Sequence, residues 1–125
     1  MRVPVPFLSY KIRIWISSML RFALHYGIHF LVPVAVGLLF FKNNKWQIVL
    51  ILLAGILIDI DHLWADPIFD PNRCSINFHP LHSYWAIAFY LMLLFFEKIR
   101  IFGIAALIHM LADATDCLFI ILQSE

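Results

Sequence analysis

Long apolar runs separated by short polar segments form the dominant pattern of the chain. Four such runs cover residues 22–41, 46–65, 81–96 and 101–122. Most of them approach the ~20 apolar residues that a helix needs to cross the hydrocarbon core of a membrane. Tight polar turns at 42–45 and 97–100 and a loop at 66–80 separate the runs. The pattern predicts an all-α integral membrane bundle of about four transmembrane helices.

The segment that precedes the first run has a different pattern. From Phe7 onward, apolar residues recur at helical spacing, and basic or hydroxyl side chains such as Lys11, Arg13 and Arg21 fall between them. A short amphipathic helix of this kind lies on the membrane surface. We therefore expect an N-terminal tail with an interfacial helix at 1–21, followed by a four-helix transmembrane domain at 22–125.

Composition supports a membrane protein and excludes one class of partner. Hydrophobic residues make up 63% of the chain and charged residues 14%, whereas a typical soluble domain is ~45–50% apolar and ~25% charged. The formal net charge is only +1, so no polybasic surface points to nucleic acid. We expect membrane lipids as the surroundings, in a bacterial inner (plasma) membrane.

The two cysteines, Cys74 and Cys117, are too few for the disulfide framework of a stapled secreted fold. They also lack the C-x-x-C spacing of a zinc ribbon. The favoured interpretation is two unpaired buried thiols, with a disulfide or a metal-ligand role as the alternatives.

Histidine and aspartate gather toward one face of the predicted bundle. They are His25, His29, His62, His79, His82 and His109, together with Asp59, Asp61, Asp66, Asp70, Asp113 and Asp116. With four spans, the N-terminus, the loop at 66–80 and the C-terminus share one side of the membrane, and all these residues lie toward that side. The turns at 42–45 and 97–100 contain neither residue type.

Helical spacing brings several of these side chains onto common helix faces. The pairs at i,i+3 or i,i+4 are Asp59 with His62, His25 with His29, and His109 with Asp113. Asp61 lies roughly 200° around an ideal helix from Asp59. Either the helix frays at this point, or the two carboxylates face different groups.

Carboxylates within a membrane need compensation. An Asp at mid-bilayer costs about 2.5–3.5 kcal/mol on insertion scales. Pairing, protonation or a metal ion can offset this cost, and His and Asp suit zinc, or else manganese or iron. A lone intramembrane His is often a hydrogen-bonding residue between helices, but the joint placement on one face favours metal binding. His25, near the interface, is the weakest candidate.

A family resemblance appears at the same residues. The stretches Leu57-Ile58-Asp59-Ile60-Asp61-His62, His82-Ser83 and His109-Met110-Leu111-Ala112-Asp113 resemble the YdjM-like membrane-bound metal-dependent hydrolases, and His29 fits their first-helix histidine. The segment 65–82 looks like a narrower family of small bacterial membrane proteins of unknown function. The resemblance covers roughly residues 24–120. Ile58 stands where the hydrolases have Pro, and His79 and His82 are closer together than their two histidines.

The residues and the resemblance together lead to a membrane-embedded metal-dependent hydrolase as the first hypothesis. The expected metal ligands are His29, Asp59, Asp61, His82, His109 and Asp113. His62 and His79 are expected as catalytic acid–base groups or as further ligands. A site near the headgroups suits a lipid or phosphoester substrate. Arg73 is either a partner for phosphate or carboxylate or a solvated loop residue.

The alternatives are a non-catalytic metal-binding membrane protein, with the metal as a structural staple, and a small transporter subunit. A transporter needs polar residues that reach the opposite face, and the halves of the spans near that face lack them.

The distribution of basic residues gives an expected orientation. Five Lys and Arg residues lie on the site-bearing face and four on the other. Four of the five precede the first span, which usually dominates orientation. This favours an N-terminus in the cytoplasm and a site open to the cytoplasmic leaflet.

Overall fold

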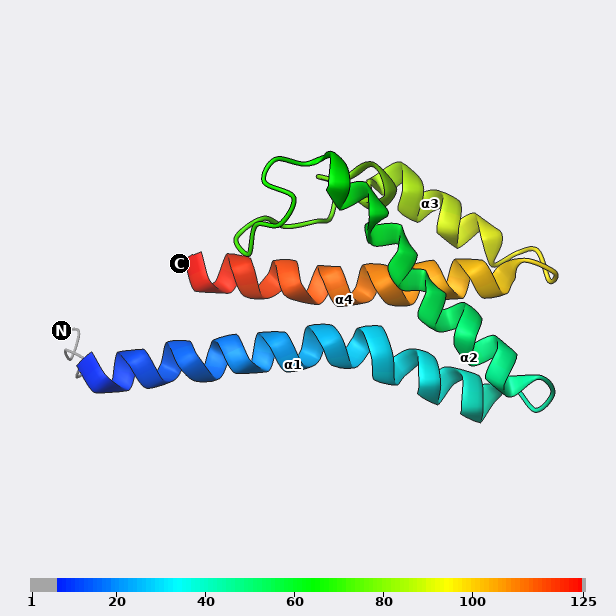
Figure 1. Ribbon diagram of the computed structural model, residues 1–125, viewed down its shortest axis with the longest axis horizontal. Helices are drawn as coiled ribbons and strands as arrows, with labels where there is room; N and C mark the ends of the chain where they lie inside the picture. The colour runs from blue at the N-terminus through cyan, green and yellow to red at the C-terminus, as the bar shows by residue number, and fades with distance from the viewer. Residues whose placement is uncertain (1–6, 125) are drawn as a thin grey trace.

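Helices account for all regular structure in the computed structural model, which describes residues 7–124. In chain order they are α1 (Phe7–Phe40), α2 (Lys45–Leu53), the 3-10 helix η1 (Ala54–Trp64), the short 3-10 helix η2 (Pro80–His82), α3 (Tyr84–Leu93) and α4 (Arg100–Ser124) (Figure 1). No strand occurs between residues 7 and 124. The predicted all-α class is therefore confirmed.

Helix α1 joins two predicted segments. It runs without interruption for 34 residues, so no helix end separates an interfacial part from a spanning part at Arg21. Gly27 and Pro33 are the first helix breakers after Phe7, and Gly27 lies six residues beyond the expected boundary. The first six residues of the predicted tail lie outside the described residues.

Three segments are long and apolar enough to cross a membrane, by length and composition: Ser9–Phe40, Lys45–Trp64, which combines α2 and η1, and Arg100–Ser124. The predicted third span at 81–96 is wrong in length. Helix α3 has 10 residues and extends about 15 Å at ~1.5 Å per residue, half of the ~30 Å core. It begins at Ser83, whose Oγ accepts a hydrogen bond from the Ala86 backbone N–H at 3.2 Å.

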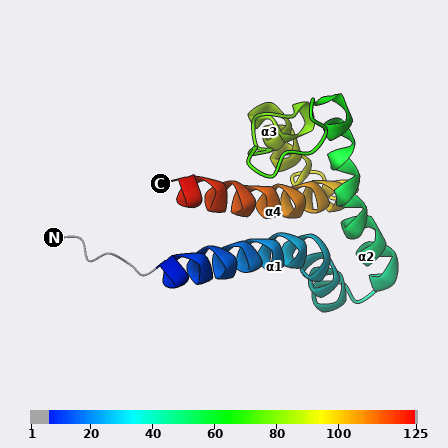
Figure 2. The ribbon, with the colours of Figure 1, turned by 60° about the vertical axis from the view of Figure 1, so that its left-hand side comes forward.

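Helix α4 is the central element. It contacts α1 on one side and α3 on the other, and it also packs against α2 and η1 (Figures 1 and 2). A Cβ on Gly55 would lie 2.7 Å from the Ala105 carbonyl oxygen, and one on Gly103 would lie 2.7 Å from the Tyr90 carbonyl oxygen. Small residues thus allow η1 and α3 to approach α4 closely.

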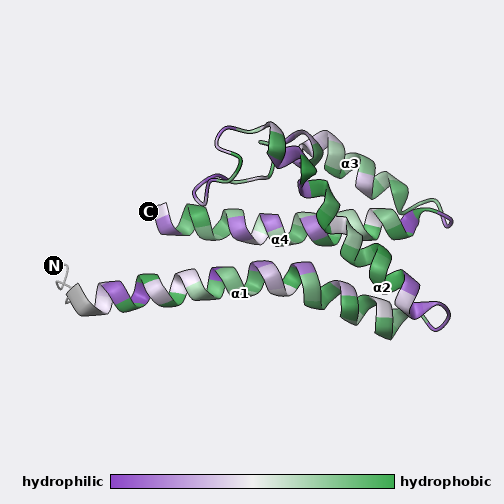
Figure 3. Ribbon diagram, viewed as in Figure 1, coloured by the Kyte–Doolittle hydropathy of each residue, from purple (hydrophilic) through white to green (hydrophobic). Residues whose placement is uncertain are grey.

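The two ends of the bundle differ in polarity. The start of α1 and the end of α4 lie at the same end of the molecule, as predicted (Figure 1). Hydrophilic positions of α1 and α4 concentrate in these terminal halves and in the middle of the bundle, next to the loop at 66–79 (Figure 3). The polar residues of the candidate site therefore share one end of the fold.

A disulfide fixes the long loop to α4. Cys74 in the loop and Cys117 on α4 are bonded, with their Cα atoms 4.8 Å apart and a sequence separation of 43. The favoured interpretation of two unpaired thiols is wrong, because the loop folds back over the second half of α4. The disulfide alternative is confirmed.

Candidate metal centre

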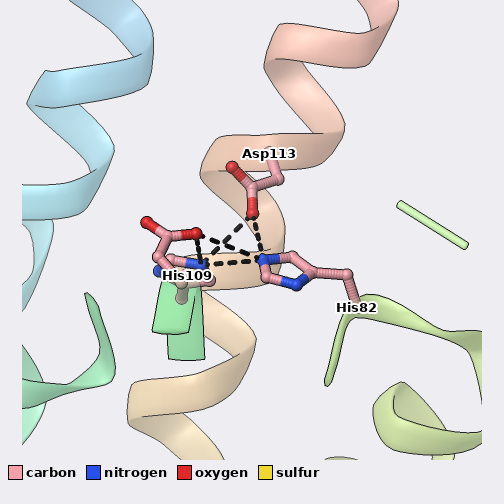
Figure 4. Close-up of side chains that lie close together, drawn as sticks. His82, His109 and Asp113 are labelled. Atoms are coloured by element: carbon pink, nitrogen blue, oxygen red, sulfur yellow. Dashed lines mark hydrogen bonds and ion pairs between the residues drawn. The ribbon is translucent and has the colours of Figure 1, made fainter. Parts of the chain in front are cut away.

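Three elements direct four side chains to one point. Asp59 comes from η1, His82 from η2, and His109 and Asp113 from successive turns of α4. Figure 4 shows His82, His109 and Asp113 facing one another across α4 and the loop before α3. We call these residues, with Asp59, the four-residue cluster. His82 and His109 are 0% and 1% exposed, so the cluster lies inside the protein.

The four potential ligand atoms are in mutual contact. The distances are 2.9 Å from His82 Nε2 to Asp113 Oδ2, 3.2 Å from His109 Nε2 to Asp113 Oδ2, 3.2 Å from His109 Nε2 to Asp59 Oδ1, 3.5 Å from His82 Nε2 to Asp59 Oδ1, and 3.1 Å between the two Nε2 atoms. A tetrahedral zinc ion with bonds of ~2.0–2.2 Å would place its ligand atoms about 3.3–3.6 Å apart. The cluster has nearly this spacing.

The chemistry of the donors also fits a cation. Two imidazole nitrogens that face each other can share only one proton, and carboxylate oxygens only accept hydrogen bonds. Two histidine nitrogens and two carboxylate oxygens pointing at one buried position are the usual environment of a divalent transition metal. The residues of the cluster therefore fit a bound zinc, manganese or iron ion.

Asp61 supports the cluster from outside. Its Oδ2 accepts hydrogen bonds from His82 Nδ1 at 3.1 Å and from the Leu81 backbone N–H at 2.7 Å. A histidine that binds metal through Nε2 commonly donates its Nδ1–H to a carboxylate in this way. The structure thus places Asp61, expected as a ligand, against the far side of His82.

The 3-10 geometry of η1 explains this arrangement. With ~3 residues per turn, Asp59 and His62 lie on the same face, and Asp61 points elsewhere. The helix therefore departs from α geometry. Both carboxylates contact His62 and His82, but Asp59 faces Nε2 of His82 whereas Asp61 faces its Nδ1.

His62 and His79 form a stacked pair beside the cluster. Their ring centroids are 3.9 Å apart, and His62 Nδ1 lies 3.2 Å from Asp61 Oδ1 and 3.4 Å from Asp59 Oδ1. Burial, and then the neighbouring His62, lower the pKa of His79 below its ordinary value. His79 Nε2 has no hydrogen-bond partner within residues 7–124. The pair lies next to the cluster, and together with Asp61 it forms a further His/Asp group with metal-ligand geometry.

His25 and His29 reach Asp113 from α1. His29 Nε2 lies 3.8 Å and His25 Nδ1 3.9 Å from Asp113 Oδ1, the carboxylate oxygen that does not face the four-residue cluster. The structure therefore places His29, expected as a ligand, in a separate group with His25 and Asp113.

A cavity of about 500 Å³ opens beside these groups. Its lining includes His29, Asp59, His62, His79 and Asp113. Apolar side chains contribute the rest of one wall, among them Phe22, Tyr26, Ile56 and Phe69. The cavity thus joins a polar site to an apolar surface.

Two arginines also line the cavity. Arg21 donates to both carboxylate oxygens of Asp116, at 2.6 and 2.8 Å, and to the Pro71 carbonyl. Arg73 donates to the carbonyls of Pro67 and Ile68, which are neutral and do not cancel its charge. Sequence reasoning did not single out Arg21, although it precedes His25 by one helical turn.

Two loop aspartates, Asp66 and Asp70, lie outside the ligand groups. Asp70 Oδ1 accepts a hydrogen bond from the Asn72 backbone N–H at 2.9 Å, which stabilises the turn at Pro71. Asp66 also belongs to the loop and to none of the three His/Asp groups with metal-ligand geometry among the described residues.

Among the comparisons with known proteins, only the comparison with protein families gives a match. Searches of curated proteins and of solved structures return no match. Residues 19–120 match DUF6122, a family of unknown function, which agrees with the expected small family of uncharacterised function. The similarity to YdjM-like hydrolases stays an expectation from sequence. Because the match covers most of the chain, the protein belongs to the DUF6122 family.

Proposed function

We propose that this protein is a membrane-embedded, metal-dependent hydrolase that acts on a lipid or another phosphoester at the membrane surface. The observation that carries the proposal is the four-residue cluster beside a cavity with both cationic and apolar walls. Zinc is the proposed metal, with manganese or iron as alternatives. The three long apolar segments support placement in a membrane, and we take this to be the bacterial inner membrane.

The proposed role of the metal follows from general chemistry. A divalent ion in such a site polarises a phosphoryl or carbonyl oxygen and lowers the pKa of a bound water toward ~7. Asp61 holds His82 with Nδ1 protonated, so that Nε2 is free to bind. Asp59 is the most accessible of the four ligands, with a side chain 38% exposed, and it faces the cavity.

His62 and His79 supply the proposed proton transfers. When His62 Nδ1–H donates to Asp61, its Nε2 accepts from Ser75 Oγ, 3.3 Å away. His79 Nε2 is buried without a hydrogen-bond partner within residues 7–124, so it can accept a proton from a substrate or water in the cavity. Such positioned imidazoles typically contribute 10²–10⁴-fold to a rate.

The cavity supports the substrate class. The guanidinium of Arg73 donates only to neutral carbonyl groups, so its positive charge is available to bind a phosphate. Phe22, Tyr26 and Phe69 offer an apolar wall for an acyl chain or another hydrophobic group. A phosphoester with an apolar substituent fits both features.

The disulfide supports an orientation opposite to the one expected from basic residues. Disulfides persist in oxidising compartments, whereas cytosolic thiols are kept reduced. Cys74 and Cys117 lie at the site-bearing end. The turns at the other end carry Lys42, Lys45 and Lys98 in short loops, where positive charge marks the cytoplasmic side. We therefore place the site on the extracytoplasmic face.

Turnover tests the proposal directly. Protein purified in mild detergent without chelator should hydrolyse a phosphodiester such as bis(p-nitrophenyl) phosphate, or phospholipid in mixed micelles. Chelator should abolish the activity, and added zinc or manganese should restore it. His109→Ala should be inactive, whereas Asp66→Asn, at an exposed loop residue that does not line the cavity, should keep full activity. Bound metal without turnover on either ester class would favour a non-catalytic metal protein.

A further inference from the structure

The two oxygens of the Asp113 carboxylate face different histidines. Oδ2 points to His82 and His109 at 2.9 and 3.2 Å. Oδ1 points to His29 and His25 at 3.8 and 3.9 Å. A carboxylate divided in this way between two sets of imidazoles has the geometry of a bridging ligand.

His29 provides an independent indication of a ligand. Its side chain is 3% exposed, and its Nε2 has no hydrogen-bond partner within residues 7–124. A buried, unpaired polar atom costs about 1–3 kcal/mol. The ring lies next to that of His109, with centroids 4.5 Å apart, and its free nitrogen points toward Asp113 Oδ1. A cation between them would satisfy this nitrogen.

We propose that His25, His29 and Asp113 hold a second divalent cation, and that Asp113 bridges it to the ion of the four-residue cluster. This inference rests on the proposed function. In two-metal hydrolytic sites the ions lie ~3.5–4 Å apart and stabilise the attacking and leaving oxygens together. A carboxylate that binds each ion through a different oxygen produces such a spacing.

The second site is the one that meets the substrate. All three of its residues line the cavity, whereas His82 and His109 of the four-residue cluster do not. Three protein ligands would leave a coordination position open for water or a substrate oxygen. We therefore expect a substrate phosphate to bind next to His25, His29 and Asp113, with the ion of the four-residue cluster beside it.

The two histidines of the second site differ in strength. His25 Nδ1 also lies 3.3 Å from the Ala112 carbonyl oxygen and must give up that hydrogen bond to bind a cation. His29 has no such competing partner within residues 7–124. Loss of His29 should therefore weaken the second site more than loss of His25.

Manganese titration followed by electron paramagnetic resonance tests the inference. Apo protein in detergent is loaded with Mn²⁺, and bound metal is counted per chain. Wild-type protein should bind two ions and give the spectrum of a coupled pair. His29→Ala should bind one ion with an uncoupled spectrum, and His25→Ala should lower the second affinity by a smaller factor. Tyr10→Phe, at an exposed residue of α1 that does not line the cavity, is the matched control and should behave as wild type.

The possible outcomes separate the two proposals. One ion in both wild-type protein and His29→Ala would overturn the second site and leave the four-residue cluster standing. No bound ion in wild-type protein would overturn both. Retention of the first ion in His29→Ala shows that the variant has folded, so the loss of the second ion then reports on the site itself.

Discussion

Asp61 is completely buried between a backbone N–H and two imidazoles. Its Oδ2 accepts from Leu81 N–H and His82 Nδ1, and its Oδ1 lies 3.2 Å from His62 Nδ1. One carboxylate therefore fixes both a ligand of the four-residue cluster and an acid–base candidate. We therefore propose that Asp61 acts on the metal of the four-residue cluster by orienting His82.

Replacing Asp61 by Asn tests this role at the scale of one residue. The amide has nearly the same shape, but it is a weaker acceptor for His82 and His62. We expect Asp61→Asn to lower zinc affinity about 10–100-fold, as is typical for such supporting carboxylates, with the helical circular dichroism spectrum unchanged. The matched control is Asp66→Asn, at an exposed loop residue that belongs to no ligand group. Complete loss of metal from Asp61→Asn would instead make Asp61 a direct ligand.

The sequence reveals the residue types of the site better than their grouping. Spacing on α4 predicts that His109 and Asp113 share a face, and they do. The separation of His29 from the four-residue cluster depends on how α1 crosses α4, and the role of Asp61 depends on a loop that returns 20 residues later. Neither is encoded in local spacing.

At the scale of elements, α4 positions the site through close contacts with its neighbours. Its buried residues include Ala105, Ala106 and Ala112, whose small side chains let the other helices approach. Gly55 of η1 meets α4 at Ala105, one turn before His109. The distance between η1 and α4 at this crossing sets how Asp59 meets His109.

A methyl group at Gly55 should disturb this crossing. Gly55→Ala would place its Cβ 2.7 Å from the Ala105 carbonyl oxygen, so η1 must move away from α4. Overpacking of this kind costs about 1–3 kcal/mol, and we expect a lower thermal unfolding temperature together with weaker zinc binding. Gly27→Ala, whose Cβ would have no neighbour within 4 Å, should neither lower the unfolding temperature nor weaken zinc binding, since Ala favours a helix over Gly. Equal effects of the two substitutions would contradict the crossing model.

The short α3 is the element that sequence pattern could not predict. Apolar residues continue through Leu94, Phe95 and Phe96 without a breaker. The chain nevertheless leaves the helix at Leu93, through i→i+3 hydrogen bonds such as Phe95 N–H to the Met92 carbonyl. These turns reverse the chain direction before α4. Gly103 has no side chain, so α3 can pack closely against α4 at this position. Tertiary packing thus ends the helix where hydropathy does not.

At the scale of the whole molecule, the disulfide and the site share one end of the bundle. The sequence correctly predicts that the polar residues gather there, because they lie alternately at the beginning of one apolar run and toward the end of the next. It does not predict the pairing of Cys74 with Cys117, because no local pattern reports the path of the loop over α4. The disulfide is also the observation behind the proposed orientation, in which the site lies on the extracytoplasmic face.

Cysteine labelling measures that orientation. A new cysteine replacing Ser124, near the site-bearing end, should react with a membrane-impermeant maleimide in intact cells, whereas one replacing Asn43 should react only after permeabilisation. Cys74 and Cys117 should remain unreactive until a reductant is added. If only the cysteine at position 43 is labelled in intact cells, the result would contradict the proposed orientation and support the one expected from the N-terminal basic residues.

Metal content is the most direct test of the central claim, that Asp59, His82, His109 and Asp113 bind a divalent ion. Protein purified in mild detergent without chelator should carry at least about one equivalent of transition metal by plasma mass spectrometry, since four protein ligands bind tightly. Asp59→Ala and His109→Ala should each lose that ion, and His25→Ala should lose much less metal. Wild-type protein without metal above background, and with no rebinding of added zinc, would contradict the claim.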